Sequence, residues 1–182
     1  MENYIRDIGK LLTKSDNFKR VCDISRSDIP PKTGLYAIAI NDVYDIGRPF
    51  RDDLIERKHN LLYIGKSQRT LRERLWDEDL HHENPAAFFR SIGAALGFRP
   101  VRGSSKNGKN YKFSTEDTEI IKNWIDEHLS VNYVDCPIEM LDETEKKLIS
   151  NYLPLLNHTH NPKKSKRLSE VKKECRDIAM DK

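Results

Sequence analysis

The chain has 182 residues, of which 37% are hydrophobic and 34% are charged, and its formal net charge is +3. This length and composition fit one domain with a modest core and a heavily solvated surface. No apolar run approaches the ~20 residues that span a bilayer, the first residues lack the features of a signal peptide, and the 3 widely separated cysteines argue against a disulfide framework or a cysteine-based zinc site. We therefore expect a soluble, intracellular, cytoplasmic protein with no membrane partner.

The first 32 residues are expected to form an extension that precedes the main domain. Residues 3–12 have the composition of a short helix, and residues 25–32, which include Pro30-Pro31, are typical of a linker. We expect the main domain over residues 33–160, followed by a basic tail over 161–182. The tail is amphipathic, with apolar residues at Leu168, Val171, Cys175 and Ile178.

Two apolar runs, residues 33–40 and 61–65, have the length and pattern of single β-strands. The first contains Gly34-Leu35-Tyr36 and the second contains Tyr63-Ile64-Gly65. If these strands pair, the two tyrosine hydroxyls lie near each other on a rigid sheet, which is where precise chemistry can be built. The polar segment 41–60 between them is expected to be a long excursion with a helical turn near residues 52–57.

The segments after the second strand alternate between helix and strand signals. Thr70-Leu-Arg-Glu73 has the capping-box pattern, which predicts a helix that continues toward His81-His82. Asn84 and Pro85 have the types favoured at the N-cap and the first position of a helix, here ending near Leu96. The remaining expected elements are a helix opened by Ser114-Thr115 and ending near Leu129, a strand over 131–136 and a helix over 141–153. Together these elements predict an α+β fold, with a small, mostly antiparallel central sheet flanked by helices and by helical extensions at both ends.

Positive charge is concentrated in two segments of the chain. Residues 99–112 contain no acidic residue, and residues 163–167 form a second basic run at the start of the tail. Such clusters are typical of surfaces that bind a polyanion, although a solvated loop and a solvated tail would have the same composition. The basic residues of the first segment, which we name the basic arm, are Arg99, Arg102, Lys106, Lys109 and Lys112.

Glu145 is the carboxylate whose position in the sequence needs an explanation. It follows Leu141 by four residues and precedes Leu148 and Ile149, so it lies on the apolar stripe of its helix. A carboxylate on such a stripe is at least partly buried and needs a cation or strong donors. Alternatively, Glu145 lies at the edge of the stripe, pairs with an arginine and has no catalytic role.

Three other motifs resemble sites for a nucleotide or a metal, and each lacks a required residue. Gly65-Lys66-Ser67 resembles the end of a phosphate-binding Walker loop, but the first glycine of that loop is replaced by Asn60, so no nucleotide cofactor is expected. His82-Glu83 lacks the second histidine of the zinc-protease helix. His158 and His160 lack a nearby third ligand for a metal.

Four motifs occur in the order found in the GIY-YIG nuclease superfamily, and the chain resembles that family over roughly residues 33–157. The motifs are Gly34-Leu-Tyr36, Tyr63-Ile-Gly-Lys-Ser67, Leu71-x-x-Arg74-Leu75 and Glu145-x-x-Leu-Ile-x-x-Tyr-x-Pro-x-x-Asn157. The family includes homing endonucleases, some restriction enzymes and an excision-repair nuclease. Leu35 stands where the family's first tripeptide has isoleucine.

The resemblance implies a role for each of these positions. Glu145 is expected to be the single protein ligand of Mg²⁺, with Mn²⁺ as a substitute, because a hard cation prefers carboxylate oxygen. Arg74 is expected to bind the scissile phosphate with its guanidinium fork. Tyr36, Tyr63 and Lys66 are the candidates to position or deprotonate the attacking water, and which of them takes the proton stays open. Asn157 is expected to hold the region of the active site together.

Two departures from the family pattern leave alternatives open. The interval from Tyr63 to the arginine is one residue longer than usual, so Arg72 is a rival of Arg74 and a candidate nucleic-acid contact. Four residues past Arg74, where the family often has histidine or tyrosine, this chain has Glu78. His81 or His82 could supply an accessory proton-handling group instead, or could simply cap the helix.

The resulting hypothesis is a Mg²⁺-dependent endonuclease that hydrolyses a DNA phosphodiester, most readily in double-stranded DNA, by in-line attack of water. The alternative, motivated by Glu78 and the shifted arginine, is a catalytically inactive module of the same fold that binds nucleic acid. The basic arm is the first candidate for a DNA contact, because its glycines let it adapt to the backbone. The sequence leaves the oligomeric state, the sequence specificity and the biological role undetermined.

Overall fold

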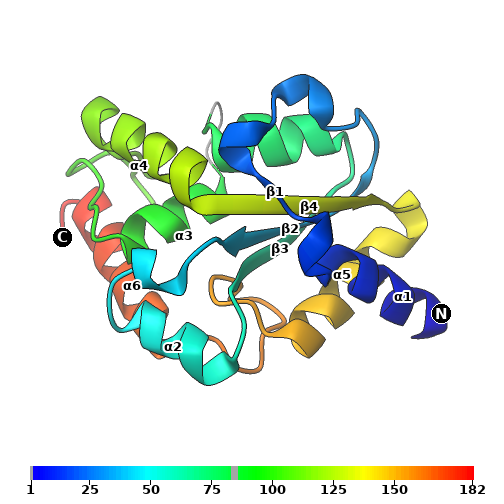
Figure 1. Cartoon of the computed structure of the whole chain (residues 1–182). Coiled ribbons are helices and arrows are strands. Elements are labelled where there is room, and N and C mark those ends of the chain that lie inside the picture. Colours follow the sequence, from blue (N-terminus) through cyan, green and yellow to red (C-terminus); the bar gives the residue numbers. More distant parts are fainter. Residues whose placement is uncertain (1, 83–85) are drawn as a thin grey trace.

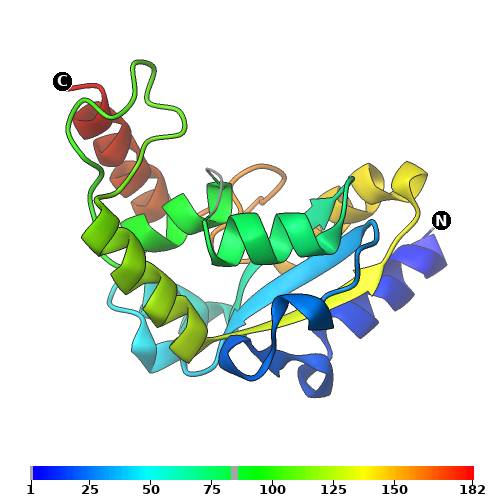
Figure 2. The same cartoon turned by 90° about the horizontal axis from the view of Figure 1, so that it is seen from above.

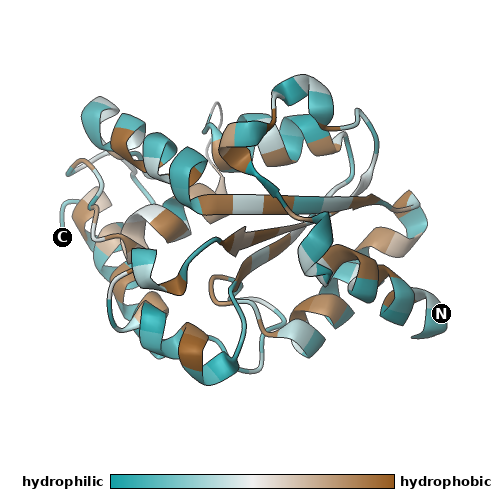
Figure 3. Ribbon diagram, in the orientation of Figure 1, coloured by the Kyte–Doolittle hydropathy of each residue, from teal (hydrophilic) through white to brown (hydrophobic). Residues whose placement is uncertain are grey.

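A computed structural model describes residues 2–82 and 86–182 and contains a four-stranded antiparallel sheet in its centre. The strands are β1 (Lys19–Arg20), β2 (Gly34–Ile40), β3 (Leu61–Ser67) and β4 (Leu129–Asp135), arranged in the order β1-β4-β2-β3. The central strand β2 pairs with β3 on one side and with β4 on the other, and β3 is therefore an edge strand. Hydrophobic residues run along the strands (Figure 3).

Helices cover both faces of this sheet (Figure 1). One face packs against α1 (Glu2–Thr13) and α5 (Ile138–Tyr152), and the other packs against the remaining helices. All seven residues of β2 are buried, which explains why its sequence is a continuous apolar run rather than an alternating one. Leu35 and Ala37 face α1 and α5, whereas Tyr36, Ile38 and Ile40 face the opposite layer. The elements that accompany this opposite layer are α2 (Phe50–Arg57), η5 (Arg72–Leu80), α3 (Ala87–Ala95), α4 (Thr115–His128) and α6 (Lys166–Ala179).

The predicted fold class is confirmed, and most predicted elements lie within a few residues of their expected places. The predicted helix over 141–153 begins earlier, at Ile138, directly after Pro137. The strand β1 was not expected; it has only two residues, both exposed, and carries no hydrophobic signal. The expected N-cap role of Asn84 and Pro85 lies outside the described residues.

Both terminal segments contribute to the core. Ile5 and Leu12 of α1 join the cluster beneath α5, and Leu168 and Cys175 of α6 join the cluster on the other face of the sheet. The amphipathic spacing of the C-terminal residues therefore corresponds to a docked helix. Within the part of the chain that the structure describes, no helix is long and apolar enough to cross a membrane.

The helix after β3 differs in type from the one expected. Its capping box is formed, because Thr70 Oγ1 donates to Glu73 Oε2 at 2.7 Å and accepts from the Glu73 amide at 3.1 Å. From Arg72 to Leu80, however, the chain forms a π-helix, in which each turn is closed by an i→i+5 hydrogen bond. His81 N to Trp76 O, at 3.1 Å, is one such bond. This wider turn determines which side chains of η5 meet at the site.

The glycines of the two tripeptides are fixed by close packing. In the register of β2 with β3, Gly65 lies opposite Tyr36, and the tyrosine ring covers it. A Cβ on Gly65 would lie 2.4 Å from both Cζ and Oη of Tyr36. A Cβ on Gly34 would lie 2.4 Å from the carbonyl oxygen of Val134. The glycines therefore make room for the tyrosine ring and for the neighbouring strand.

We predict that Gly65→Ala destabilises the protein by about 1–3 kcal/mol or more, because the new methyl group overlaps the buried ring of Tyr36. Urea denaturation measures this change. Gly47→Ala is the matched control, since a Cβ there meets nothing within 4 Å. Equal stability of the two variants would contradict the close packing of Tyr36 on Gly65.

Candidate active site

The two tyrosines of the motifs lie on the same face of the sheet. Tyr63 is opposite Ile38 in the register, which places it diagonally beside Tyr36, and the two ring centroids are 6.3 Å apart. The register shifts between Ile38 and Ala39, so that Leu62 is an extra residue in β3 next to Tyr63. Such bulges re-aim side chains and occur often beside active sites. Tyr36 is fully buried, whereas Tyr63 reaches the wall of a cavity.

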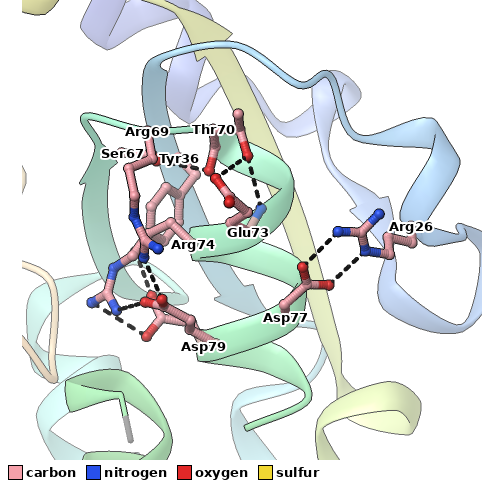
Figure 4. A network of polar contacts seen from close by, with 10 residues as sticks. Arg26, Tyr36, Ser67, Arg69, Thr70, Glu73, Arg74, Asp77 and Asp79 are labelled. Carbon is pink, nitrogen blue, oxygen red and sulfur yellow. Dashed lines mark hydrogen bonds and ion pairs between the residues drawn. The ribbon is translucent and has the colours of Figure 1, made fainter. Parts of the chain in front are cut away.

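Arg74 extends from η5 to this tyrosine pair and contacts two carboxylates. Its Nη1 lies 2.7 Å from Glu78 Oε2, and its Nη2 lies 3.5 Å from Asp79 Oδ1. In a π-helix the residues four and five positions ahead both lie near residue i, so one guanidinium can reach both acids. Figure 4 shows Arg74, Asp79 and Tyr36 on one side of the helix. Glu78 is also paired with Arg69. Burial raises the pKa of Glu78, but its hydrogen bonds to Arg74 and to Arg69 keep that pKa below the ordinary value.

Asp79 is the central carboxylate of this group and was missed in the sequence. Its side chain is fully buried, and its Oδ2 accepts a short hydrogen bond from the hydroxyl of Tyr36. Burial raises its pKa to about 6, although Arg74 and the Tyr36 hydroxyl act in the opposite direction. The sequence does contain a signal for a buried carboxylate here. Asp79 follows Leu71 and Leu75 at four-residue spacing, so it lies on the apolar stripe of its helix, as Glu145 does on its own helix.

The surroundings of both tyrosines favour their neutral form. Burial, followed by the charge of Asp79, raises the pKa of Tyr36 well above its ordinary value. The same two causes raise the pKa of Tyr63, while Arg74 lowers it and Glu145 raises it further. For Arg74, burial opposes the charge, but Tyr36, Asp79 and Glu78 raise its pKa and keep it cationic.

Arg72 and the paired histidines lie away from this group. The Nε of Arg72 donates to the carbonyls of Arg26 and Ile29, both at 3.1 Å, and so binds η5 to the N-terminal segment. His81 packs on Trp76, with ring centroids 4.2 Å apart. His82 stacks on Phe89, and burial, followed by nearby cations, lowers its pKa to about 4. In this arrangement Arg74, and not Arg72, is beside the tyrosines.

The second half of the site lies on the α5 side of β3. Lys66 Nζ lies 2.7 Å from Glu145 Oε2 and 2.7 Å from Asp142 Oδ1. Burial opposes the charge of Lys66, but the hydrogen bonds to these two carboxylates raise its pKa above the ordinary value. The side chain of Glu145 is 17% exposed, so it lies at the edge of the apolar stripe rather than under it. The ammonium group is thus shared by two acids.

The two halves meet because β3 is the edge of the sheet. A cavity of about 220 Å³ is lined by Tyr63 from one face and by Glu145 from the other. Asn157 lies in the same wall and fastens the edge strand: its Oδ1 accepts from the Ile64 amide at 2.8 Å, and its Nδ2 donates to the Ile64 carbonyl at 2.9 Å. A sheet edge left open in this way would carry unpaired backbone groups, and Asn157 satisfies them.

The donor chemistry of this cavity fits a hard divalent cation. No group of three or more histidine, cysteine or acidic side chains among the described residues is arranged to hold a metal by itself. Mg²⁺ does not require such a group, because it commonly binds one or two carboxylates and completes its shell with water and phosphate. Glu145 offers a carboxylate at the cavity wall, and the ammonium of Lys66 already occupies a cation position between Glu145 and Asp142.

The basic arm is docked on α6, and its residues differ in availability. Arg99 is paired with Glu174 at 2.9 Å, and Arg102 is paired with Asp181 at 3.0 Å. The structure therefore brings together Tyr36, Tyr63 and Arg74, and separately Lys66 and Glu145, around β3. The arm itself lies beside α6 (Figure 2), and none of its basic residues lines the cavity at β3.

The raised pKa of Asp79 predicts a pH dependence of stability. Because its folded pKa of about 6 exceeds the ordinary 3.8, the folded protein binds more protons than the unfolded chain between these values. The contribution of Asp79 to stability is therefore largest below pH 3.8 and is lost as the pH rises through about 6. The groups that act on it are Tyr36, Tyr63, Arg74, Glu78, Arg90 and the backbone of Phe88. Asp79→Asn should flatten the fall in unfolding free energy over this range, as measured by urea denaturation at several pH values, and unchanged slopes would contradict the assignment.

Comparison with known proteins agrees with the motifs and the geometry. The model of the GIY-YIG catalytic domain matches residues 34–176. Comparisons with curated proteins and with solved structures gave no match. The matched segment covers most of the chain and includes both tyrosines, Arg74, Glu145 and Asn157. The chain therefore belongs to the GIY-YIG family, and a nuclease-type function on nucleic acid follows from that membership.

Proposed function

We propose that the protein is a metal-dependent endonuclease that hydrolyses phosphodiester bonds of DNA by in-line attack of water. The observation that carries this proposal is the meeting of Tyr63 and Glu145 in one cavity at the edge strand β3, with Arg74 beside Tyr63 and Lys66 beside Glu145. Phosphoryl-group chemistry needs positioned donors and positive charge more than a covalent intermediate. These residues supply both.

Arg74 is the group we assign to the scissile phosphate. A guanidinium binds two phosphate oxygens at once and stabilises negative charge that grows in the transition state. Asp79 and Glu78 hold the guanidinium beside the tyrosines, so its orientation is set before substrate binds. Such preorganisation lowers the cost of arranging charges during the reaction.

Tyr63 is the tyrosine we assign to the attacking water. Its side chain lines the cavity, whereas the hydroxyl of Tyr36 is buried and donates to Asp79. In this assignment Tyr63 orients the water, and Tyr36 positions Asp79 and, through it, Arg74. Lys66 remains protonated while it is bound to its two carboxylates, so it contributes positive charge rather than acting as the base.

Glu145 is the residue we assign to a divalent cation, Mg²⁺ or in its place Mn²⁺. A bound Mg²⁺ would supply charge neutralisation at the phosphate oxygens. Lys66 shares Oε2 of Glu145, so the carboxylate keeps a cationic neighbour when no substrate is present.

Glu145→Gln should reduce cleavage of plasmid DNA in Mg²⁺ by at least about a hundredfold, because the amide cannot hold the cation. The measurement is the rate of nicking, with DNA affinity determined in EDTA and unfolding followed in urea as checks. Glu143→Gln is the matched control, since Glu143 is an exposed residue of the same helix. Cleavage by Glu145→Gln at the wild-type rate would refute the proposed chemistry.

A second candidate function is a module that binds nucleic acid without cutting it. The observation that favours it is the pairing of both key cations with acids of the same chain: Arg74 with Glu78, and Lys66 with Glu145. A phosphate has to compete with these carboxylates. Under this alternative the protein binds DNA with strong salt dependence and does not nick it in Mg²⁺ or Mn²⁺.

Glu78→Gln tests how much the ion pair restrains Arg74. Removing this charge should strengthen DNA binding in EDTA by about five- to tenfold, because Arg74 is released toward phosphate. Glu119→Gln, an exposed change on α4, should have little effect and serves as the control. If Glu78→Gln leaves the affinity unchanged, Arg74 is not in contact with the bound strand.

A further inference from the structure

A pocket lined only by basic and neutral residues adjoins the cavity at β3. It has a volume of about 290 Å³ and lies between α3, the basic arm and α6. Its basic side chains are Arg90, Lys109, Lys172 and Arg176. Ala87 and Lys172 line this pocket and also the cavity that holds Tyr63 and Glu145. The pocket and the cavity are therefore adjacent and share part of their walls.

The basic side chains of this pocket have no ion-pair partner among the described residues. None of their ion pairs involves the four basic side chains, and the Nη1 of Arg90 is buried without a hydrogen-bond partner. Arg90 instead lies over the ring of Tyr111, with Cζ 5.7 Å from the ring centroid. A buried guanidinium nitrogen without a partner costs free energy unless a ligand supplies an acceptor.

The acids of the neighbouring helix are engaged elsewhere. Each of the acids near the C-terminal half of α6 is paired with a cation outside the pocket: Glu170 with Arg167, Glu174 with Arg99, Asp177 with Lys173, and Asp181 with Arg102. Lys172 and Arg176 are four residues apart and share one face of the helix. Burial, followed by Arg90 and Arg176, lowers the pKa of Lys172, as expected where like charges are gathered.

The arm is shaped to lie against this face. Gly108 has a φ of +67°, and a Cβ there would approach Arg176 Cβ to 3.1 Å. Backbone bonds from Gly103 to Ile178 and from Ser105 to Ala179 hold the arm on the end of α6. One side of the pocket is thus a segment of the arm that is held in place on α6.

We propose that this pocket binds a non-scissile phosphate of the nucleic-acid strand whose scissile phosphate lies at Arg74. That a phosphate binds in the pocket is inferred from the pocket itself. That a scissile phosphate of the same strand lies at Arg74 rests on the proposed nuclease function. The volume is about ten times the ~30 Å³ that a water molecule occupies in the liquid, which accommodates a phosphate group with its solvent. Arg90 lies near both the pocket and Arg74, because it lines the pocket and the charges of Asp79 and Arg74 act on it.

The first experiment measures binding of a labelled DNA duplex to the full-length protein in EDTA, so that cleavage does not enter. Arg176→Gln should weaken binding by about five- to tenfold and reduce the slope of log K against log salt by about 0.9. Lys173→Gln removes a charge from the same helix, but from a side chain that lies outside the pocket and is paired with Asp177 at 2.6 Å, and it should change affinity by less than about twofold. Equal effects of the two changes would overturn the proposal.

A second measurement identifies the phosphate itself. Duplexes in which single phosphates are replaced by neutral methylphosphonates should include one position whose neutralisation weakens wild-type binding but has little further effect on Arg176→Gln. Lys172→Gln should behave like Arg176→Gln at the same position. No such position in either variant would exclude a phosphate in this pocket.

A third arm separates the strand from free phosphate. Inorganic phosphate should raise the unfolding temperature of the wild type and of Arg176→Gln by the same amount, because its general salt effect acts on both proteins alike. If phosphate stabilises the wild type but not Arg176→Gln, while both bind DNA equally, the pocket is a site for the free anion and the proposal fails. Nicking by the wild type in Mg²⁺, measured separately, decides the proposed function without reference to this pocket.

Discussion

The structure of this site depends on one buried carboxylate, that of Asp79. A charge removed from water must be compensated by donors and by an opposite charge, and the chain provides both from different elements. Tyr36 of β2 donates its hydroxyl to Asp79, and Arg74 of η5 approaches it to 3.5 Å. The compensation of the charge of Asp79 therefore fixes the positions of Tyr36 and Arg74, which belong to two separate sequence motifs. It also requires the wider turn of η5, which brings Asp79 and Glu78 to the same side as Arg74.

The location of the site follows from the order of the strands. Since β3 is at the edge of the sheet, side chains from its two faces can reach a common rim, as Tyr63 and Lys66 do. An exposed edge is also a hazard, because its unpaired backbone groups invite other strands. Asn157 and the backbone of Leu155 and Leu156 bind to β3 and close most of this edge. The same segment that protects the edge thus forms one wall of the cavity.

Much of the fold could be predicted from local pattern, and the failures have physical causes. The runs around Tyr36 and Tyr63 predicted adjacent strands, and the stripe containing Glu145 predicted a half-buried carboxylate. The π-helix has no signature in the sequence, since the same residues satisfy an α-helical spacing; the choice between Arg72 and Arg74 therefore needed coordinates. The basic arm was the first candidate for a DNA contact, and its composition does not show that Arg99 has a partner in a helix 75 residues away.

The distribution of charge around α6 explains how a chain with a net charge of only +3 can present a strongly positive surface beside its cavity. The carboxylates of α6 neutralise the outer cations, including Arg99, whereas Lys172 and Arg176 line the pocket and form no ion pair within the described residues. Positive groups that are not paired within the protein can attract an anionic ligand more strongly than paired ones. A low-dielectric wall strengthens this attraction. Because the pocket and the cavity at β3 share Ala87 and Lys172, a strand bound in the pocket and at Arg74 is held at two points, and two points define both its position and its direction across the edge of β3.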